Sequence, residues 1–346
     1  MRMKSGLVTA LGLGAGCLSL EYLRRRTWLH LRRKIVLITG GSRGLGLAMA
    51  REFGSRGAIV AICARDGREL ERAHTDLSMR GVESHTFVCD VTDRGQVLAM
   101  VADVTQRLGS IDVLANSAGI IKVGPFLEMD IDDFNQAMQV MFWGSLYTTL
   151  AVLPAMLARK AGRIVNITSL GGKVSVPHLL PYSCAKFAAV ALSEGLRAEL
   201  GPQGIRVTTI VPGLLRTGSH LKAEFKGKHS KEYAWFAAGA ATPVVSIAAQ
   251  RAARAIVRAT IRGIGEKILS VPADGLARLH GLFPSLTGEI LSLANRMLPS
   301  PRRDGSRHIR TGDDIEAQFN SRLWKTATLL GQRAAENLNE IQPAAW

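Results

Sequence analysis

Short runs of β-branched and other apolar residues alternate with longer segments of helical periodicity along most of this chain. Runs that are apolar on both faces are typical of strands buried in a parallel sheet. The helical segments between them supply the crossovers that parallel strands need. The pattern predicts an α/β fold with strands at residues 34–39, 58–63, 84–89, 111–115, 162–168, 205–211 and 266–271, and a long helix at 132–159.

The glycine-rich segment TGGSRGLG at residues 39–46 follows the first of these strands and opens the first helix. Glycines let the chain turn sharply and bring backbone N–H groups against a phosphate, and a helix N-terminus favours negative charge. In this context the segment predicts a Rossmann-type doubly wound parallel sheet of about seven strands that binds a dinucleotide. We expect contacts from Gly40, Ser42, Arg43, Gly44, Leu45 and Gly46.

The end of the second strand indicates which dinucleotide is bound. Sites that prefer NAD usually place an acidic residue there, to accept a hydrogen bond from the ribose 2′-hydroxyl. Here Ala64 holds that position and Arg65 follows, while Arg43 lies within the glycine loop. Two guanidinium groups can bind a 2′-phosphate, so we expect NADP(H). Asp66 is the one acid nearby, and it can instead cap the following helix.

Tyr182 and Lys186 begin the helix after the fifth strand, one turn apart on the same face. An ammonium group lowers the pKa of a neighbouring phenol, which can then exchange a proton with a carbonyl or hydroxyl oxygen near neutral pH. Ser169 ends the fifth strand, where its hydroxyl can orient a substrate oxygen. We therefore predict Ser169, Tyr182 and Lys186 as catalytic residues, with Tyr182 and Lys186 also beside the cofactor.

These motifs together resemble the short-chain dehydrogenases/reductases over roughly residues 34–272. The resemblance implies hydride transfer at the nicotinamide C4, with Tyr182 as the acid or base. It also implies homodimers or homotetramers formed through the two long helices. The further cofactor-site residues that it implies are Asp90 and Val91 at the adenine, Asn116, Ala118 and Gly119 supporting the sheet and cofactor, and Pro212, Gly213 and Thr217 around the nicotinamide.

The chain departs from the family pattern in the long helix before the fifth strand. Many members carry an asparagine there that holds a proton-relay water, and Met141 stands at that position. A thioether is a poor substitute for an amide in hydrogen bonding. Three functions stay open: an oxidoreductase for an alcohol or carbonyl on a lipophilic small-molecule substrate, a cofactor-binding scaffold with little activity, or a weakly active membrane-associated protein whose basic clusters bind anionic lipid.

The formal net charge of +16 is compatible with a polyanionic partner. No nucleic-acid-binding motif accompanies the arginine clusters at residues 24–34 and 302–310, so we expect no nucleic acid partner. The four cysteines form no CxxC pair and the eight histidines no ligand cluster, so we predict neither a disulfide framework nor a metal.

Residues 6–20 are apolar and glycine-rich, and the heavier basic flank lies on their C-terminal side. A spanning helix needs about 20 apolar residues, so this segment is marginal in length. Both a membrane anchor, with the rest of the chain on the cytoplasmic side, and a helix packed on the protein surface remain open. We assign residues 1–33 to this segment and its basic flank, and 34–272 to the dinucleotide-binding domain.

Two segments fall outside the alternation of strands and helices. Residues 214–246 contain aromatic side chains that look exposed and are typical of a lid. Residues 273–346 form a mostly helical C-terminal extension. Its first part repeats apolar residues from Leu276 to Met297 on one helix face, with a kink expected at Pro284. That face could cover the enzyme's own core, a second subunit or a membrane. The last stretch is predicted to be helical, without assignable chemistry.

Overall fold

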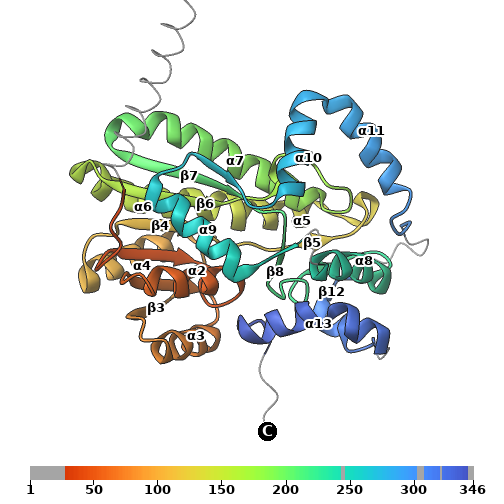
Figure 1. Cartoon of the computed structure of the whole chain (residues 1–346), viewed down its shortest axis with the longest axis horizontal. Coiled ribbons are helices and arrows are strands. Elements are labelled where there is room, and N and C mark those ends of the chain that lie inside the picture. The colour runs from red at the N-terminus through yellow and green to blue at the C-terminus, as the bar shows by residue number, and fades with distance from the viewer. Residues whose placement is uncertain (1–27, 243–245, 302–307, 320–321, 342–346) are drawn as a thin grey trace, which may run out of the picture.

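Seven parallel strands form the central sheet of the computed structural model, which describes residues 28–242, 246–301, 308–319 and 322–341 (Figure 1). The strand order is β11-β7-β6-β4-β1-β2-β3. This confirms the predicted fold class, and each strand of this sheet overlaps a predicted one. The strands are β1 (Ile35–Thr39), β2 (Ile59–Ala64), β3 (Ser84–Val88), β4 (Val113–Asn116), β6 (Gly162–Ile167), β7 (Ile205–Val211) and β11 (Glu266–Ile268).

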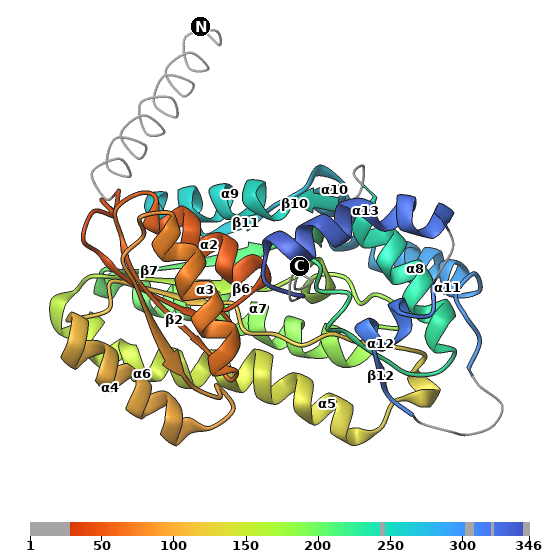
Figure 2. The same ribbon diagram turned by 90° about the horizontal axis from the view of Figure 1, so that it is seen from below.

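Helices cover both faces of this sheet, as Figure 2 shows for α2 and α9 on one side and α4 and α6 on the other. Successive residues of a strand point to opposite faces. Val36 and Ile38 of β1 thus pack with Leu47 of α2, whereas Leu37 packs with Val104 of α4. The covering helices are α2 (Gly44–Gly54), α3 (Gly67–Met79) and α9 (Ala249–Arg262) on the first face, and α4 (Arg94–Leu108), α6 (Gly144–Arg159) and α7 (Leu180–Leu200) on the second.

The predicted long helix at 132–159 is divided by a π-helical turn. It consists of α5 (Ile131–Met138), the π turn at Gln139–Trp143 and α6. By length and composition this stretch could also cross a membrane. In this structure α6 packs against α4 and buries Val152 and Met156 in the core. An apolar composition of this kind is also found in helices that pack in the core of a protein. A π turn inserts one residue into the helix and often marks a functional site.

A second, smaller core lies beyond the carboxyl edge of the sheet. Tyr233 and Phe225, predicted to be exposed on a lid, are fully buried in it, and Phe236 is also buried. The prediction was wrong because Phe319 and Trp324 of the C-terminal extension pack on Tyr233. The surrounding elements are β5 (Lys122–Val123), β8 (Leu214–Arg216), β9 (Glu224–Phe225), α8 (His229–Ala241), β10 (Ser246–Ala248), β12 (Arg310–Thr311), α12 (Gly312–Glu316) and α13 (Arg322–Asn337).

The helix expected to kink at Pro284 is instead two helices, α10 (Val271–Leu282) and α11 (Pro284–Asn295). They stand away from the body of the molecule (Figure 1). Ile290, Leu293 and Met297 are exposed, with Met297 at 87%. We considered that this apolar face packs against the enzyme's own core. Within the described residues, α11 does not do so. The apolar segment at residues 6–20 lies outside the described residues.

Candidate active site and nucleotide site

The predicted site residues follow the carboxyl ends of six strands of the central sheet. Since all these strands are parallel, their ends meet at one edge. β1 lies between β2 and β4, so the strand order reverses on either side of the glycine loop. Such a reversal opens a ligand crevice. The groups that follow β1, β2, β3, β4, β6 and β7 are respectively the glycine loop, Arg65, Asp90 with Val91, residues 116–119, Ser169 and residues 212–217.

The Ser169 hydroxyl and the Tyr182 ring lie beside the same glycine, Gly171. Ser169 comes directly after β6 and Thr168, and its Oγ accepts a hydrogen bond from the Gly171 amide at 3.0 Å. Tyr182 lies in the first turn of α7, which Pro181 helps to begin because its fixed φ suits that position. Burial raises the Tyr182 pKa, and the neighbouring Ser169 hydroxyl opposes that shift. A side chain at Gly171 would crowd the phenol, since its Cβ would lie 3.2 Å from the ring.

Lys186 lies one turn after Tyr182 and is buried. Its Nζ donates to the Ile167 carbonyl oxygen at 2.8 Å and lies 5.7 Å from the centre of the Tyr182 ring. Burial lowers the Lys186 pKa to about 8. The ammonium thus faces the phenol ring, but the expected lowering of the Tyr182 pKa was wrong: burial of the phenol raises its pKa, and Ser169, rather than Lys186, opposes that shift. Ser169, Tyr182 and Lys186 nevertheless form one group.

Met141 borders this group from the π turn. It is buried and packs with Tyr182 and Ala185. A Cβ built on Gly119 would lie 3.7 Å from the Met141 sulfur and 3.9 Å from the Lys186 Nζ. The position at which many family members carry asparagine therefore faces the catalytic group, and in this chain it presents an apolar thioether to it.

Asn116 at the end of β4 links strands and helices from within the core. Its Nδ2 donates to Asn166 Oδ1 at 2.9 Å, and its Oδ1 accepts from the Thr148 hydroxyl at 2.7 Å. The following loop lies against the glycine loop, because a Cβ on Gly40 would come within 2.9 Å of the Ala118 Cα. Gly40 has φ +63°, which glycine adopts readily. Thus Asn116 supports the sheet, while Ala118 and Gly119 line its carboxyl edge.

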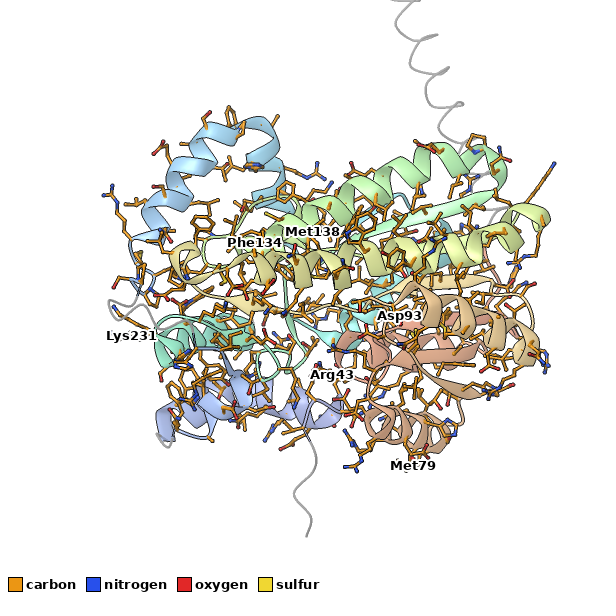
Figure 3. All side chains as sticks on the ribbon, turned by 180° about the vertical axis from the view of Figure 1, so that it is seen from behind. Arg43, Met79, Asp93, Phe134, Met138 and Lys231 are labelled. Carbon is orange, nitrogen blue, oxygen red and sulfur yellow. The ribbon has the colours of Figure 1, made fainter. Side chains whose placement is uncertain are left out.

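The two arginines expected at the 2′-phosphate differ in their surroundings. Arg65 is exposed just after β2. The adjacent Asp66 caps α3, accepting from the amides of Arg68 at 2.8 Å and Glu69 at 3.1 Å. This is the capping role considered for it from the sequence. Arg43 lies between the start of the sheet and α13 (Figure 3). Its Nε lies 3.4 Å from Glu69 Oε2, and its pKa is raised by carboxylates despite burial.

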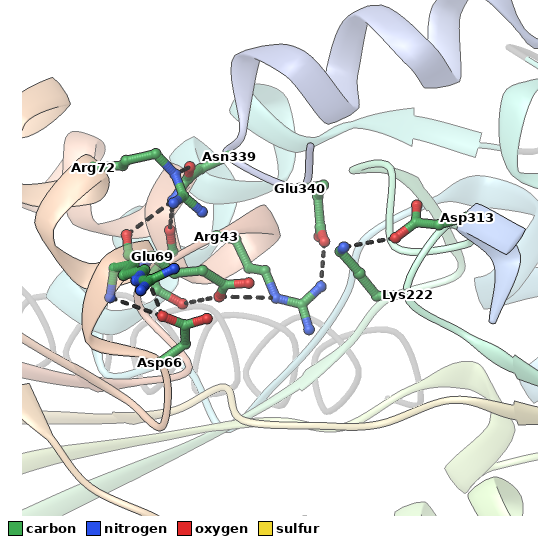
Figure 4. A network of polar contacts seen from close by, with 10 residues as sticks. Arg43, Asp66, Glu69, Arg72, Lys222, Asp313, Asn339 and Glu340 are labelled. Atoms are coloured by element: carbon green, nitrogen blue, oxygen red, sulfur yellow. Dashed lines mark hydrogen bonds and ion pairs between the residues drawn. The ribbon is translucent and has the colours of Figure 1, made fainter. Parts of the chain in front are cut away.

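The C-terminal segment reaches the glycine loop, which sequence reasoning did not anticipate (Figure 4). Arg43 forms an ion pair with Glu340. The Gly44 amide donates to the Leu338 carbonyl oxygen at 2.8 Å, and Asn339 Nδ2 donates to the Ser42 carbonyl oxygen at 2.8 Å. The sequence contained no pattern that could predict the roles of Leu338, Asn339 and Glu340. No motif or periodicity identifies a contact between positions 297 residues apart, such as Arg43 and Glu340.

The donors at the start of α2 fit the diphosphate of a dinucleotide. The helix has no side-chain cap and no acidic residue in its first turn. Gly46 is so close to Gly40 that a Cβ there would lie 2.0 Å from the Gly40 oxygen. A tight glycine turn at a helix N-terminus, with a neighbouring guanidinium group, is the chemistry that phosphates require. Gly44, Arg43 and Arg65 would hold the phosphates, and Lys186 a ribose.

Comparison with known proteins agrees with this geometry. A family model described as short chain dehydrogenase matches residues 34–226. A dehydrogenase/reductase SDR family protein 7-like of Anopheles gambiae is 40% identical over 208 residues, covering 58% of this chain and 64% of its own. The chain thus spans slightly less than two thirds of that relative.

Solved structures of the same kind also match. One is a gluconate 5-dehydrogenase from Burkholderia cenocepacia in complex with NADP and tartrate, with a TM-score of 0.62, 25% identity and coverage of 71% of this chain and 97% of its own. Another is a variant of the actinorhodin polyketide ketoreductase with NADPH, with a TM-score of 0.60, 30% identity and coverage of 69% and 95%. Since the family model alone matches more than half of its residues, the chain belongs to the short-chain dehydrogenase/reductase family of oxidoreductases, enzymes that act on alcohol and carbonyl groups.

Proposed function

We propose that this chain is an NADP(H)-dependent oxidoreductase that interconverts an alcohol and a carbonyl on a lipophilic small molecule. The observation that carries the proposal is the grouping of Ser169, Tyr182 and Lys186 at the sheet edge that also bears the glycine loop. A phenol beside a serine hydroxyl, with an ammonium group 5.7 Å from the phenol ring centre, is sufficient for proton transfer to or from a substrate oxygen.

Each residue of the group has a distinct role in this proposal. The bound nicotinamide supplies or accepts the hydride. Ser169 donates a hydrogen bond to the substrate oxygen and orients it. Tyr182 gives its proton to a carbonyl oxygen during reduction and takes one from a hydroxyl during oxidation. Lys186 favours the phenolate by its charge and holds a ribose hydroxyl. Lys186 is buried and Ser169 and Tyr182 are half-buried, and the low dielectric constant of such surroundings strengthens these interactions.

The preference for NADP(H) is supported by charge at the adenosine end. Ala64 leaves no carboxylate where NAD-preferring sites have one, and Asp66 is engaged in capping α3. Arg65 and Arg43 supply two guanidinium groups for a 2′-phosphate. The two solved structures described above, in complex with NADP and with NADPH, give further support.

A lipophilic substrate and membrane association are supported by apolar surface. Helix α11 belongs to a helical hairpin that projects from the body of the molecule. It exposes three apolar side chains, spaced three or four residues apart and therefore on one face of the helix: Leu286, Ile290 and Leu293. The apolar segment at residues 6–20 with its basic flank would add an anchor that keeps the enzyme on the cytoplasmic side. We further propose a dimer or tetramer formed through the long helices α5–α6 and α7.

Replacing Tyr182 by phenylalanine removes only the reacting hydroxyl. We expect Tyr182→Phe to lower kcat with NADPH by at least about 100-fold, the contribution of general acid–base catalysis. The dissociation constant of NADPH should change less than about twofold. Tyr147→Phe, which removes a phenol hydroxyl on α6, serves as the control. Unchanged turnover in Tyr182→Phe would contradict the proposal.

An enzyme that binds NADPH without turnover, even after Met141→Asn, would favour the scaffold alternative.

Arg65 is the cleaner test of cofactor preference, because Arg43 also contacts Glu340. We expect Arg65→Ala to weaken NADPH binding about tenfold or more, the loss of a charge-assisted hydrogen bond, and to leave NADH binding unchanged. Fluorescence titration with both cofactors measures this. Arg254→Ala on α9, also exposed, is the matched control. Equal weakening of NADPH and NADH would argue against a contact with the 2′-phosphate.

The buried Lys186 ammonium should reduce stability in a pH-dependent manner. Its folded pKa of about 8 lies below the usual 10.5, so the folded chain loses this proton first as pH rises. Burial therefore destabilises the fold below pH 8, and the cost disappears as pH approaches 10.5. We expect Lys186→Met to abolish turnover while raising the unfolding free energy by roughly 2 kcal/mol at neutral pH. Urea unfolding across pH tests this, with Lys231→Met as the control. A stability gain independent of pH would contradict it.

Liposome flotation tests the proposed anchor. We compare the full chain with one lacking residues 1–27, since Leu29 and Leu31 belong to the folded domain: the Leu29 amide bonds to Ile261 and Leu31 is buried. The full chain should float with vesicles containing anionic lipid, and the truncated chain should lose most of that recovery because it lacks the apolar segment and the arginines at 24–26. Equal recovery of the two chains would remove the anchor from the proposal.

A further inference from the structure

We infer that the C-terminal segment, residues 338–340, binds at the phosphate end of the nucleotide site and that the cofactor must displace it to bind. The inference rests on the proposed cofactor site and concerns its regulation. Figure 4 shows the contacts, which join the glycine loop to the last described residues of the chain.

The segment uses the groups expected to bind phosphate. Gly44 begins α2, and its amide donates to the Leu338 carbonyl oxygen at 2.8 Å. Arg43, expected at the 2′-phosphate, is paired with the Glu340 carboxylate. An amide at a helix N-terminus and a guanidinium group are the usual partners of a phosphate oxygen. A carbonyl and a carboxylate oxygen thus take both hydrogen bonds that the cofactor needs.

The segment also fills the space in which a phosphate would lie. Glu340 Oε1 would come within 2.7 Å of a Cβ built on Gly44, so the carboxylate lies directly over this glycine. The Thr217 Cβ is 3.9 Å from the same point. The carboxylate and Thr217 therefore both lie beside Gly44, at the glycine loop that we expect to bind the cofactor. A diphosphate bound at the Gly44 amide would therefore have to displace this segment.

Further contacts hold the segment in register. Asn339 Nδ2 donates to the carbonyl oxygens of Ser42 at 2.8 Å and Glu69 at 3.0 Å. Its Oδ1 accepts from Arg72 Nε at 2.8 Å. Leu338 is fully buried in the main core cluster. The side chains of three successive residues therefore each contact the nucleotide-binding half of the sheet, which distinguishes this segment from a chain end that lies loosely on a surface.

The free energy that holds the segment in place is small enough for the cofactor to displace it, because favourable and unfavourable contributions oppose each other. Glu340 is buried, and burial raises its pKa although Arg43 opposes the shift. The ion pair therefore offsets only part of the desolvation of the carboxylate. Asn339 has φ +59°, a left-handed conformation that an asparagine adopts at some cost. A diphosphate carries more negative charge than one carboxylate and can replace it at Arg43.

The expected consequence is a weaker apparent affinity for the cofactor. When only a fraction of the chains has the segment released, the apparent dissociation constant rises by the inverse of that fraction. Loss of the Glu340 charge should increase the released fraction, because the segment then loses its ion pair with Arg43, which retains Glu69 as a partner. We therefore expect Glu340→Gln to bind NADPH about tenfold more tightly, which corresponds to about 1.4 kcal/mol.

The matched control is Glu336→Gln, which removes the same charge from an exposed position at the end of α13. NADPH fluorescence titration of the full chain and both variants gives the affinities. Because a charge change near Arg43 could act without displacement, hydrogen exchange of the peptide spanning residues 334–341 in the unmodified chain gives a second readout. Saturating NADPH should increase its exchange, while peptides of α9 should not change.

The outcomes separate this inference from the proposed function. Tighter NADPH binding by Glu340→Gln alone, together with increased exchange at 334–341, supports displacement. NADPH binding with Tyr182-dependent turnover, but with this peptide still protected, overturns the inference and leaves the proposed function standing. An affinity that is equal in all three proteins also overturns it. Failure of all three to bind NADPH or NADH overturns the proposed function itself.

Discussion

The amides at the start of α2 are the element on which both parts of the site depend. β1 delivers the chain to the carboxyl edge where the strand order reverses, and the glycines let it turn into the helix without side chains in the way. Because the helix lacks its own cap, these amides require an external acceptor. A cofactor diphosphate and the Leu338 carbonyl are two acceptors for the same donors, and this shared demand connects catalysis to the C-terminal segment.

The catalytic group shows the opposing effects of burial. Enclosure of Tyr182 and Lys186 disfavours the charged form of each, raising the pKa of the phenol and lowering that of the ammonium. At neutral pH the Tyr182 phenol is therefore protonated, as suits a residue that must donate a proton to a carbonyl oxygen, while Lys186, with a pKa of about 8, still carries its charge. Met141 makes the surroundings drier still, since it offers a thioether where many relatives have an amide. The geometry of the group is thus preserved, while its polarity differs from that of many relatives.

The C-terminal extension has two different roles in the structure. α12 and α13 close the second core over Tyr233 and carry residues 338–340 to the glycine loop. α10 and α11 instead project from the body with Ile290 and Leu293 exposed. The extension therefore covers apolar surface with α12 and α13 and exposes it on α10 and α11. The residues that reach the cofactor site and the exposed apolar face thus belong to separate elements.

The sequence by itself determined the seven-stranded sheet and the positions of Ser169, Tyr182 and Lys186, because local periodicity sets each strand and parallel strands bring their ends to one edge. The cap formed by Asp66 could also be anticipated, since its partners are two and three residues away. Only the tertiary structure decided that Tyr233 is buried, that α11 is exposed and that Glu340 reaches Arg43. Those outcomes depend on contacts between segments distant in sequence, and local patterns of charge and hydrophobicity do not specify which distant surface a segment will cover.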